Sequence, residues 1–214
     1  MAEAAPRNDR RKLRTRAALM RAGQRLFARH SVDAVSIDDI VAAADVAKGS
    51  FYNHFPDKEA LAREIAGLVR AEAEAEVEAA NEGVSDPVAR MARAQAVFVR
   101  FAARNPERAR AMMRLFAGAT VPNAPLNSGL RADVRAGLDA GAYQGLTLET
   151  GVLMAMGTAL VAVSHVLDPD AGADPAGVAP ALIFALLRSL GVADAAARDA
   201  AGAAAADIFK ESER

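Results

Sequence analysis

The side chains best suited to bind another molecule gather in one short segment, residues 48–58. Lys48 carries a point charge that can pair with a phosphate, and the hydroxyls of Ser50 and Tyr52 can reach a phosphate or a base edge. Asn53 offers the amide donor and acceptor that match adenine. These residue types in one window indicate contact with nucleic acid.

Two short helices and a tight turn must position these groups. Ser36 can cap the first helix, because its hydroxyl can accept a hydrogen bond from the amide of Asp39. The apolar face of that helix is formed by Ile37, Ile40, Val41 and Ala44. Residues 45–47 interrupt the pattern, and the second helix places Phe51 and Phe55 one turn apart, facing inward. The polar residues around these two phenylalanines therefore lie on the outside.

The second helix stops at Pro56, and Asp57 can cap a third helix. Lys58 lies in the first turn of that helix, where a backbone phosphate could meet both its ammonium and the exposed amides. For any one polar residue here, including His54, packing in the protein core is the more common role. Six such residues in a window of eleven favour contact with DNA.

The segment from Ser36 to Lys58 resembles the DNA-binding helix-turn-helix of TetR-family transcriptional repressors. The matching parts are the serine at its start, the sequence K-G-S-F-Y-N-H-F and the following run P-D-K-E-A-L. Asp45 stands where the family commonly has glycine, and must adopt the turn geometry that glycine takes more easily. Ala47 stands where Ser or Thr often precedes the Lys-Gly pair, and it offers no hydroxyl to a phosphate.

The resemblance covers about residues 10–70, and the rest of the chain matches the family only in its helical pattern. It implies an all-α fold, with an N-terminal three-helix helix-turn-helix module and a C-terminal helical domain for ligand binding and dimerisation. We expect a disordered basic arm over residues 1–9, the DNA-binding domain over 10–56, a connecting helix over 57–82 and the effector-binding and dimerisation domain over 83–214. The predicted DNA contacts are Ser36, Lys48, Gly49, Ser50, Tyr52, Asn53, His54 and Lys58.

The charges divide unevenly along the 214 residues, although the net charge is only -1. Residues 1–58 hold eleven Lys or Arg against seven Asp or Glu, whereas residues 59–214 hold fifteen against twenty. The basic excess at the presumed DNA end strengthens phosphate attraction in a salt-dependent way. The basic arm either touches the DNA backbone or minor groove or is a solvated tail that aids solubility.

The sequence lacks the features of an enzyme or a metalloprotein. It has no cysteine, and its three histidines, His30, His54 and His165, are widely separated. No G-x-S-x-G, H-E-x-x-H or phosphate-binding glycine loop occurs. We therefore expect no catalysis, no cofactor and no metal, and a cytoplasmic location suits a chain without cysteine.

Two apolar helices near the C-terminus, 147–167 and 175–190, are rich in small residues that let helices approach closely. They resemble the four-helix dimer interface of the family, and the alternative is that they form the core of the monomer. We expect these helices both to contribute to the core of the monomer and to form the interface of a homodimer. Gly151 to Leu167 comes closest to a membrane span, but its small and polar residues favour a helix packed inside a soluble protein.

An effector site is predicted from Phe and Met side chains of the C-terminal domain, although such side chains more often form plain core. The candidates are Phe98, Phe101, Met112, Met113, Phe116, Met154 and His165. The arginine-rich stretch 90–114 either binds an anionic group of the effector or lies on solvated faces. The long helix over 57–82 is the expected lever between the domains.

The favoured function is a repressor that leaves a palindromic operator when it binds a small, largely apolar effector. A dimer would place two recognition helices at half-sites roughly 34 Å, or a multiple of that, apart. The alternative is a helical binding protein, without enzymatic activity, whose basic N-terminal face serves a protein partner.

Overall fold

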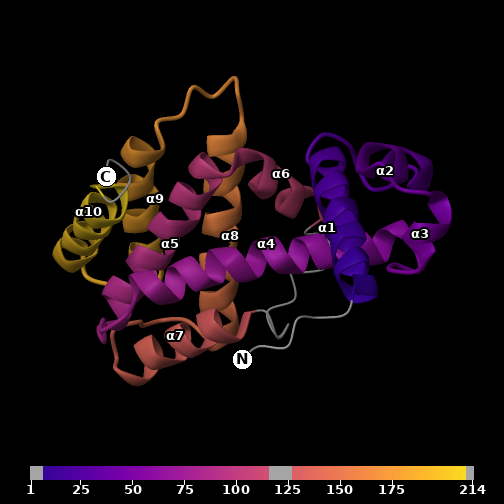
Figure 1. Cartoon of the computed structure of the whole chain (residues 1–214). Helices are drawn as coiled ribbons and strands as arrows, with labels where there is room; N and C mark the ends of the chain where they lie inside the picture. The colour runs from indigo at the N-terminus through magenta and orange to yellow at the C-terminus, as the bar shows by residue number, and fades with distance from the viewer. Residues whose placement is uncertain (1–6, 116–126, 211–214) are drawn as a thin grey trace. The chain divides into compact units, whose positions relative to one another are not determined.

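The computed structural model describes residues 7–115 and 127–210, and every regular element in those ranges is an α-helix (Figure 1). This confirms the all-α prediction. The helices are α1 (Arg7–Phe27), α2 (Ile37–Ala44), α3 (Lys48–Tyr52), α4 (Lys58–Ala80), α5 (Pro87–Arg104), α6 (Pro106–Leu115), α7 (Ser128–Asp139), α8 (Leu148–Leu167), α9 (Pro175–Ser189) and α10 (Asp194–Lys210).

The chain folds as two compact units. The first unit is Met1–Arg70 with Glu107–Phe116, and the second is Ala71–Pro106 with Ala117–Arg214. Helix α4 therefore belongs to both units, and most of α6 groups with the first, where Arg29 pairs with Glu107 at 3.4 Å. Hydrophobic periodicity shows which face of a helix is apolar, but not which distant helix that face meets. The grouping of α6 with the first unit therefore does not show in the sequence.

One core holds α1, α2, α3 and the first half of α4 together in the first unit. Its members are almost fully buried: Leu19, Ala22, Phe27, Ile40, Val41, Phe51, Phe55, Leu61, Ala62, Ile65 and Val69. Helix α1 already begins at Arg7, so the last three residues of the arm predicted over 1–9 are helical. Leu19, Ala22 and Phe27 are the residues that α1 contributes to this core.

Gly23 marks the closest approach of α1 to α4. A Cβ atom built there would lie 2.9 Å from both Ile65 Cδ1 and Leu61 Cδ2. The absence of a side chain at this position lets the tips of two α4 side chains fill the space against the α1 backbone. Gly67, further along α4, has nothing within 4 Å of its corresponding position.

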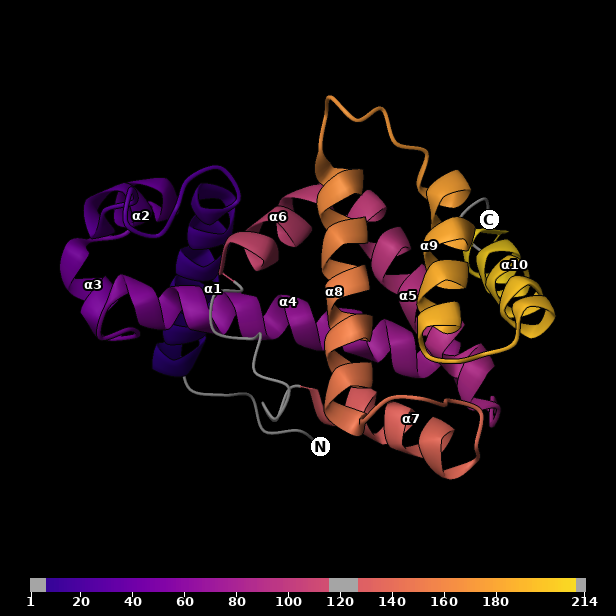
Figure 2. The same ribbon diagram turned by 180° about the vertical axis from the view of Figure 1, so that it is seen from behind.

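The second unit is built around α5, whose neighbours are α7, α8, α9 and α10 (Figure 2). Met91, Ala92 and Val97 of α5 are almost fully buried in this core. Asp86 caps α5 by accepting from the amides of Val88 and Ala89, at 3.3 and 3.1 Å, just before an N-terminal proline. The order of Ser85, Asp86 and Pro87 in the sequence favours a helix start here.

Helix α8 is only partly covered by its own unit. It is the one helix in the described ranges that is long and apolar enough to cross a membrane, and 33% of its most apolar window is buried. Leu153 and Val161 are 46% and 63% exposed, and Gly157 lies between them on the same side of the helix. The prediction of a helix inside the core thus holds for one side of α8, and the other side leaves apolar area open.

Alanine substitutions at Gly23 and Gly67 should change stability in opposite directions. Gly67→Ala should stabilise the protein by about 0.5–1 kcal/mol, since alanine is the better helix former and the site is open. Gly23→Ala gains the same helix propensity but overpacks the contact with α4, which typically costs about 1–3 kcal/mol, so a net loss near 1 kcal/mol is expected. Urea unfolding followed by circular dichroism measures both, and a stabilised Gly23→Ala would contradict the tight α1–α4 contact.

Candidate nucleic-acid interface

Ser36 and Asp39 form a reciprocal cap at the start of α2. The Ser36 Oγ accepts from the Asp39 amide at 3.1 Å, and Asp39 Oδ2 accepts from the Ser36 amide at 2.9 Å and from its hydroxyl at 2.6 Å. The side-chain bond first, and then the backbone bond, lowers the pKa of Asp39 below its usual value. The predicted cap is confirmed, and contact of Ser36 with DNA stays a prediction.

Asp45 turns the chain between α2 and α3 in a left-handed conformation, with φ 54° and ψ 52°. It is the one residue other than glycine with positive φ in the described ranges. Its amide donates to the Ala42 carbonyl at 3.2 Å, and the amide of Val46 donates to the Val41 carbonyl at 3.1 Å. Aspartate tolerates this conformation better than most residues do, so it fills the place of glycine as expected.

Helix α3 has five residues, and buried aromatic rings hold it in place. Phe51 and Phe55 are almost fully buried, as predicted, with ring centroids 5.8 Å apart. Ala47 precedes the helix and provides no side-chain cap. The helix ends at Tyr52, earlier than the sequence suggested, and the amides of His54 and Phe55 close the turn on the Phe51 carbonyl at 2.9 Å.

The predicted contact residues of α3 share its outer side. Lys48, Gly49, Tyr52 and Asn53 are exposed, with Tyr52 at 54%, whereas Ser50 and His54 are half-buried. Burial first, and then the positive charges of Arg16 and Lys12, lowers the pKa of His54 below 6.5. His54 is therefore mostly neutral at pH 7 and suits a hydrogen bond better than an ion pair with phosphate.

The two lysines of the predicted set differ in their partners. Lys48 Nζ lies 2.8 Å from Asp38 Oδ1 and 3.0 Å from Oδ2. Lys58 Nζ donates to the carbonyls of Asp33 and Val35, at 3.2 and 2.9 Å. An ammonium group has three hydrogens to donate, so these two bonds use most of the hydrogen-bonding capacity of Lys58. The two bonds tie α4 to the loop before α2. Contact of Lys58 with a phosphate remains a prediction.

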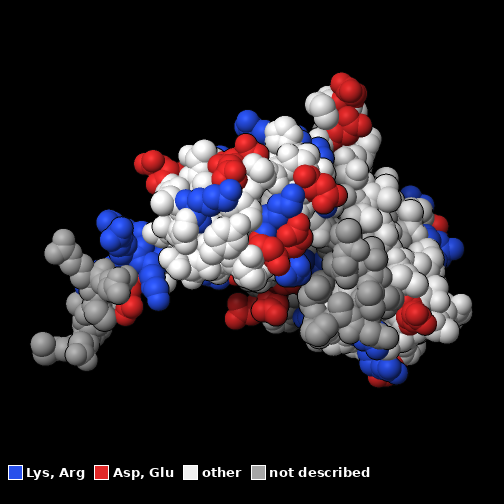
Figure 3. Space-filling model, turned by 90° about the vertical axis from the view of Figure 1, so that its right-hand side faces the viewer, with Lys and Arg blue, Asp and Glu red and all other residues white. Residues whose placement is uncertain are grey.

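The face over α2 and α3 mixes charges of both signs. Figure 3 shows basic and acidic side chains beside one another within an otherwise uncharged surface. The Lys48–Asp38 pair belongs to this surface, and both side chains are more than half exposed. Asp38 was missed at the sequence level, because ten residues separate it from Lys48 and no helical or strand spacing links them.

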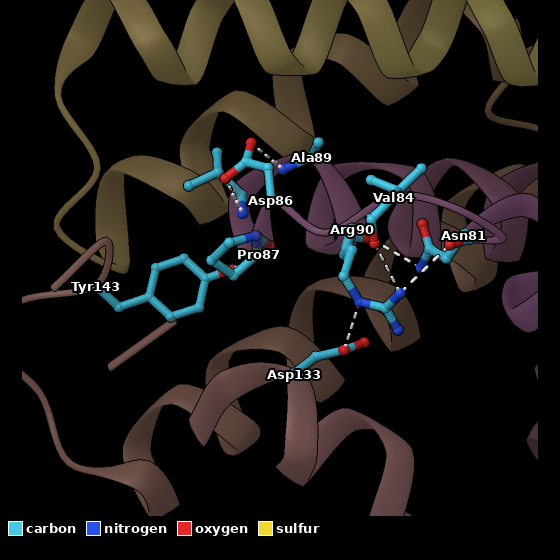
Figure 4. Close-up of polar contacts among 9 residues, drawn as sticks. Asn81, Val84, Asp86, Pro87, Ala89, Arg90, Asp133 and Tyr143 are labelled. Carbon is cyan, nitrogen blue, oxygen red and sulfur yellow. Dashed lines mark hydrogen bonds and ion pairs between the residues drawn. The ribbon is translucent and has the colours of Figure 1, made fainter. Parts of the chain in front are cut away.

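The arginines of α5 have roles that neither sequence alternative described. Arg90 donates through Nε to Asp133 at 2.8 Å, and through Nη1 to the carbonyls of Val84 and Asn81 at 3.2 and 3.4 Å (Figure 4). Nearby, the Tyr143 hydroxyl donates to the Pro87 carbonyl at 2.7 Å, and burial raises the pKa of that hydroxyl.

Arg93 and Arg100 extend the same pattern along α5. Arg93 Nε donates to the Ala80 carbonyl at the end of α4, at 2.7 Å, and its guanidinium pairs with Asp207. Arg100 is only 7% exposed. It donates to the Ile208 carbonyl at 3.1 Å and to Glu76 at 3.2 Å. These three arginines join helices inside the second unit.

The residues predicted to border an effector site are divided between the two units, and the site stays a prediction. Phe98 and Met154 pack half-buried against the core of the second unit, and Phe101 is buried. His165 is exposed in the last turn of α8. Met112 and Met113 lie on α6, in the first unit. Phe116 lies outside the described residues.

A packed core of helices that presents a short helix with exposed polar residues is typical of a helix-turn-helix DNA-binding domain. Residues 19–65 match the family profile described as bacterial regulatory proteins, tetR family. A stretch of 47 residues is 43% identical to the HTH-type transcriptional repressor DhaR of Mycobacterium sp. (strain GP1). That match spans 22% of this chain and 24% of the length of the relative.

Solved structures share the fold over most of the chain. A bacterial regulatory protein in the tetR family from Rhodococcus RHA1 has a TM-score of 0.69 and 22% identity, covering 84% of this chain and 98% of its own. RolR in complex with the ligand resorcinol has a TM-score of 0.59 and 23% identity, covering 90% of this chain and 95% of its own. Residues 19–65 therefore form a DNA-binding domain of the tetR type, and the rest of the chain shares the fold of these regulators.

Replacing Arg100 should destabilise the second unit. Arg100→Met leaves Glu76 and the Ile208 carbonyl without this partner, and we expect a loss of about 2–3 kcal/mol, since Glu76 is partly exposed and water offsets part of the cost. Chemical unfolding followed by circular dichroism measures the loss. Arg114→Met is the control, because Arg114 is exposed and its replacement should stay within about 0.5 kcal/mol. Equal stability of the two variants would contradict a structural role for Arg100.

Proposed function

We propose that this chain is a homodimeric repressor that binds a palindromic operator and leaves it when a small, largely apolar effector binds. The outer side of α3 is the observation that carries the proposal. Lys48, Tyr52 and Asn53 are exposed there, whereas the buried Phe51 and Phe55 anchor the helix from below. Side chains displayed in this way can enter a major groove and contact base edges and phosphates.

The electrostatics support binding to DNA at the first unit. The basic excess of residues 1–58 includes the exposed Arg10, Arg11, Lys12 and Arg14 near the start of α1. Each phosphate contact releases condensed counterions, so affinity should fall as salt rises. A protein that works on chromosomal DNA is expected in the cytoplasm.

Dimerisation through α8 and α9 would cover apolar area that a single chain leaves open. The exposed Leu153, Gly157 and Val161 of α8 and the exposed Ala181 and Ala185 of α9 supply that area. A second copy offers the same surfaces and can bury them symmetrically. Two recognition helices then read half-sites roughly 34 Å, or a multiple of that, apart.

An effector would act through α4, the helix that both units share. Leu61 and Ile65 of α4 are buried in the core of the first unit, and Arg93 and Arg100 hold its C-terminal half in the second. RolR, which has a similar fold, is known in complex with resorcinol, a small aromatic compound. The Phe and Met side chains of the second unit suit an effector of comparable size and polarity. Its effect on DNA binding is limited to the difference between its affinities for the two states.

Alanine at either of two exposed α3 positions should weaken operator binding without unfolding the protein. Tyr52→Ala or Lys48→Ala removes a contact from both half-sites, so a loss of at least about 30-fold is expected from about 1 kcal/mol or more per half-site. The operator is first obtained by selecting duplexes from a random pool with the wild-type protein. Affinity for the selected duplex is then measured by fluorescence anisotropy.

Lys210→Ala is the matched control, because Lys210 is exposed on α10 in the second unit. It should retain wild-type affinity, and all variants should keep the helicity and mass of the wild-type dimer. Wild-type affinity of Tyr52→Ala and Lys48→Ala would show that α3 is not the reading surface. Failure to select any palindromic duplex would favour a protein partner for the basic face.

A further inference from the structure

We propose that Asp38 is a specificity-determining residue that reads, together with Lys48, one G·C base pair in each half-site. The proposal rests on the proposed function, since it concerns the same surface. The two Asp38 oxygens lie 2.8 and 3.0 Å from Lys48 Nζ, so α2 and α3 present a hydrogen-bond acceptor and a donor side by side. The hydrogen bond to Asp38, and then the attraction between the two charges, raises the pKa of Lys48.

Two neighbouring carboxylates of α2 have separate tasks. Asp39 turns back to Ser36 and completes the cap, which fixes the first turn of the helix. Asp38 takes no part in the cap and extends from the exposed side of the same turn toward Lys48. The cap therefore holds the backbone from which Asp38 projects, and the carboxylate of Asp38 stays available on the surface over α2 and α3.

The groove edge of a G·C pair is complementary to such an acceptor and donor. Guanine presents the acceptors N7 and O6, and the paired cytosine presents the N4 amino donor beside them. Lys48 can donate to guanine while the Asp38 carboxylate accepts from cytosine N4. An A·T pair in the same orientation would set the carboxylate against thymine O4, acceptor against acceptor. The pair of side chains thus favours one base pair, whereas a lone lysine would donate to several bases or to phosphate.

The negative charge of Asp38 has a second effect on specificity. Near the phosphate backbone it repels DNA of any sequence, and it competes with phosphate for Lys48. An exposed ion pair of this kind is weak, so Lys48 can leave it when a suitable base lies opposite. Asp38 should therefore lower non-specific affinity and raise the ratio of specific to non-specific binding.

Selection from a random duplex pool, carried out with the full chain and with Asp38→Asn, tests the proposal. The wild type should enrich a palindrome with G·C at one position of each half-site. Asp38→Asn should lose that preference by about fivefold or more and shift toward A·T, because the amide can donate to thymine O4 and a carboxylate cannot. It should also bind unselected duplex more tightly than the wild type does.

Asp45→Asn is the control for the loss of one negative charge from this module. Asp45 is exposed in the same module, and asparagine tolerates its left-handed backbone. This variant should keep the wild-type preference at every position. An Asp38→Asn protein that enriches the wild-type sequence at every position, even with raised affinity for all duplexes, would overturn the proposal. Failure of the proposed function would look different, because the wild type itself would then enrich no palindrome.

Discussion

Burial of Phe51 and Phe55 is the interaction on which the recognition surface depends. Helices shorter than about 12–15 residues are marginal in water, and α3 has five residues with no side-chain cap. Its shape must therefore come from packing, and each fully buried phenylalanine contributes about 1.5–3 kcal/mol. Arg16 adds to this packing, since its guanidinium lies 5.2 Å from the centroid of the Phe55 ring and pairs with Glu64 of α4.

The second unit uses a different kind of contact to hold α4. The last carbonyls of a helix have no partner within the helix, and Arg93 satisfies that of Ala80 from α5. Arg100 binds the Glu76 side chain one turn earlier and the Ile208 carbonyl near the end of α10. Helix α4 is thus fixed by apolar side chains in one unit and by charged hydrogen bonds in the other. A helix held at both ends can carry a change in either unit to the other, which fits the proposed release by an effector.

Local signals in the sequence predicted the elements and much of the recognition surface. Ser36, Pro56 and Pro87 marked helix ends, and the spacing of Phe51 and Phe55 showed which side of α3 is buried. Contacts between distant residues could not be predicted in this way. Contact of Lys58 with a phosphate is predicted from its place in the first turn of a helix, which the sequence shows. Its bonds to two loop carbonyls depend on the tertiary fold. The pairing of Asp38 with Lys48 and the grouping of α6 with the first unit were missed for the same reason.

Hydrogen–deuterium exchange over residues 47–55 in the free protein tests most directly whether the core holds the recognition helix ready for DNA. The amides of His54 and Phe55 bond to the Phe51 carbonyl, and the helix rests on the same core as α1. Their exchange should therefore be slowed to a degree similar to that of the buried part of α1, before any DNA is added. Exchange over this segment as fast as in an unfolded peptide would show that α3 forms only on binding, and would contradict the account.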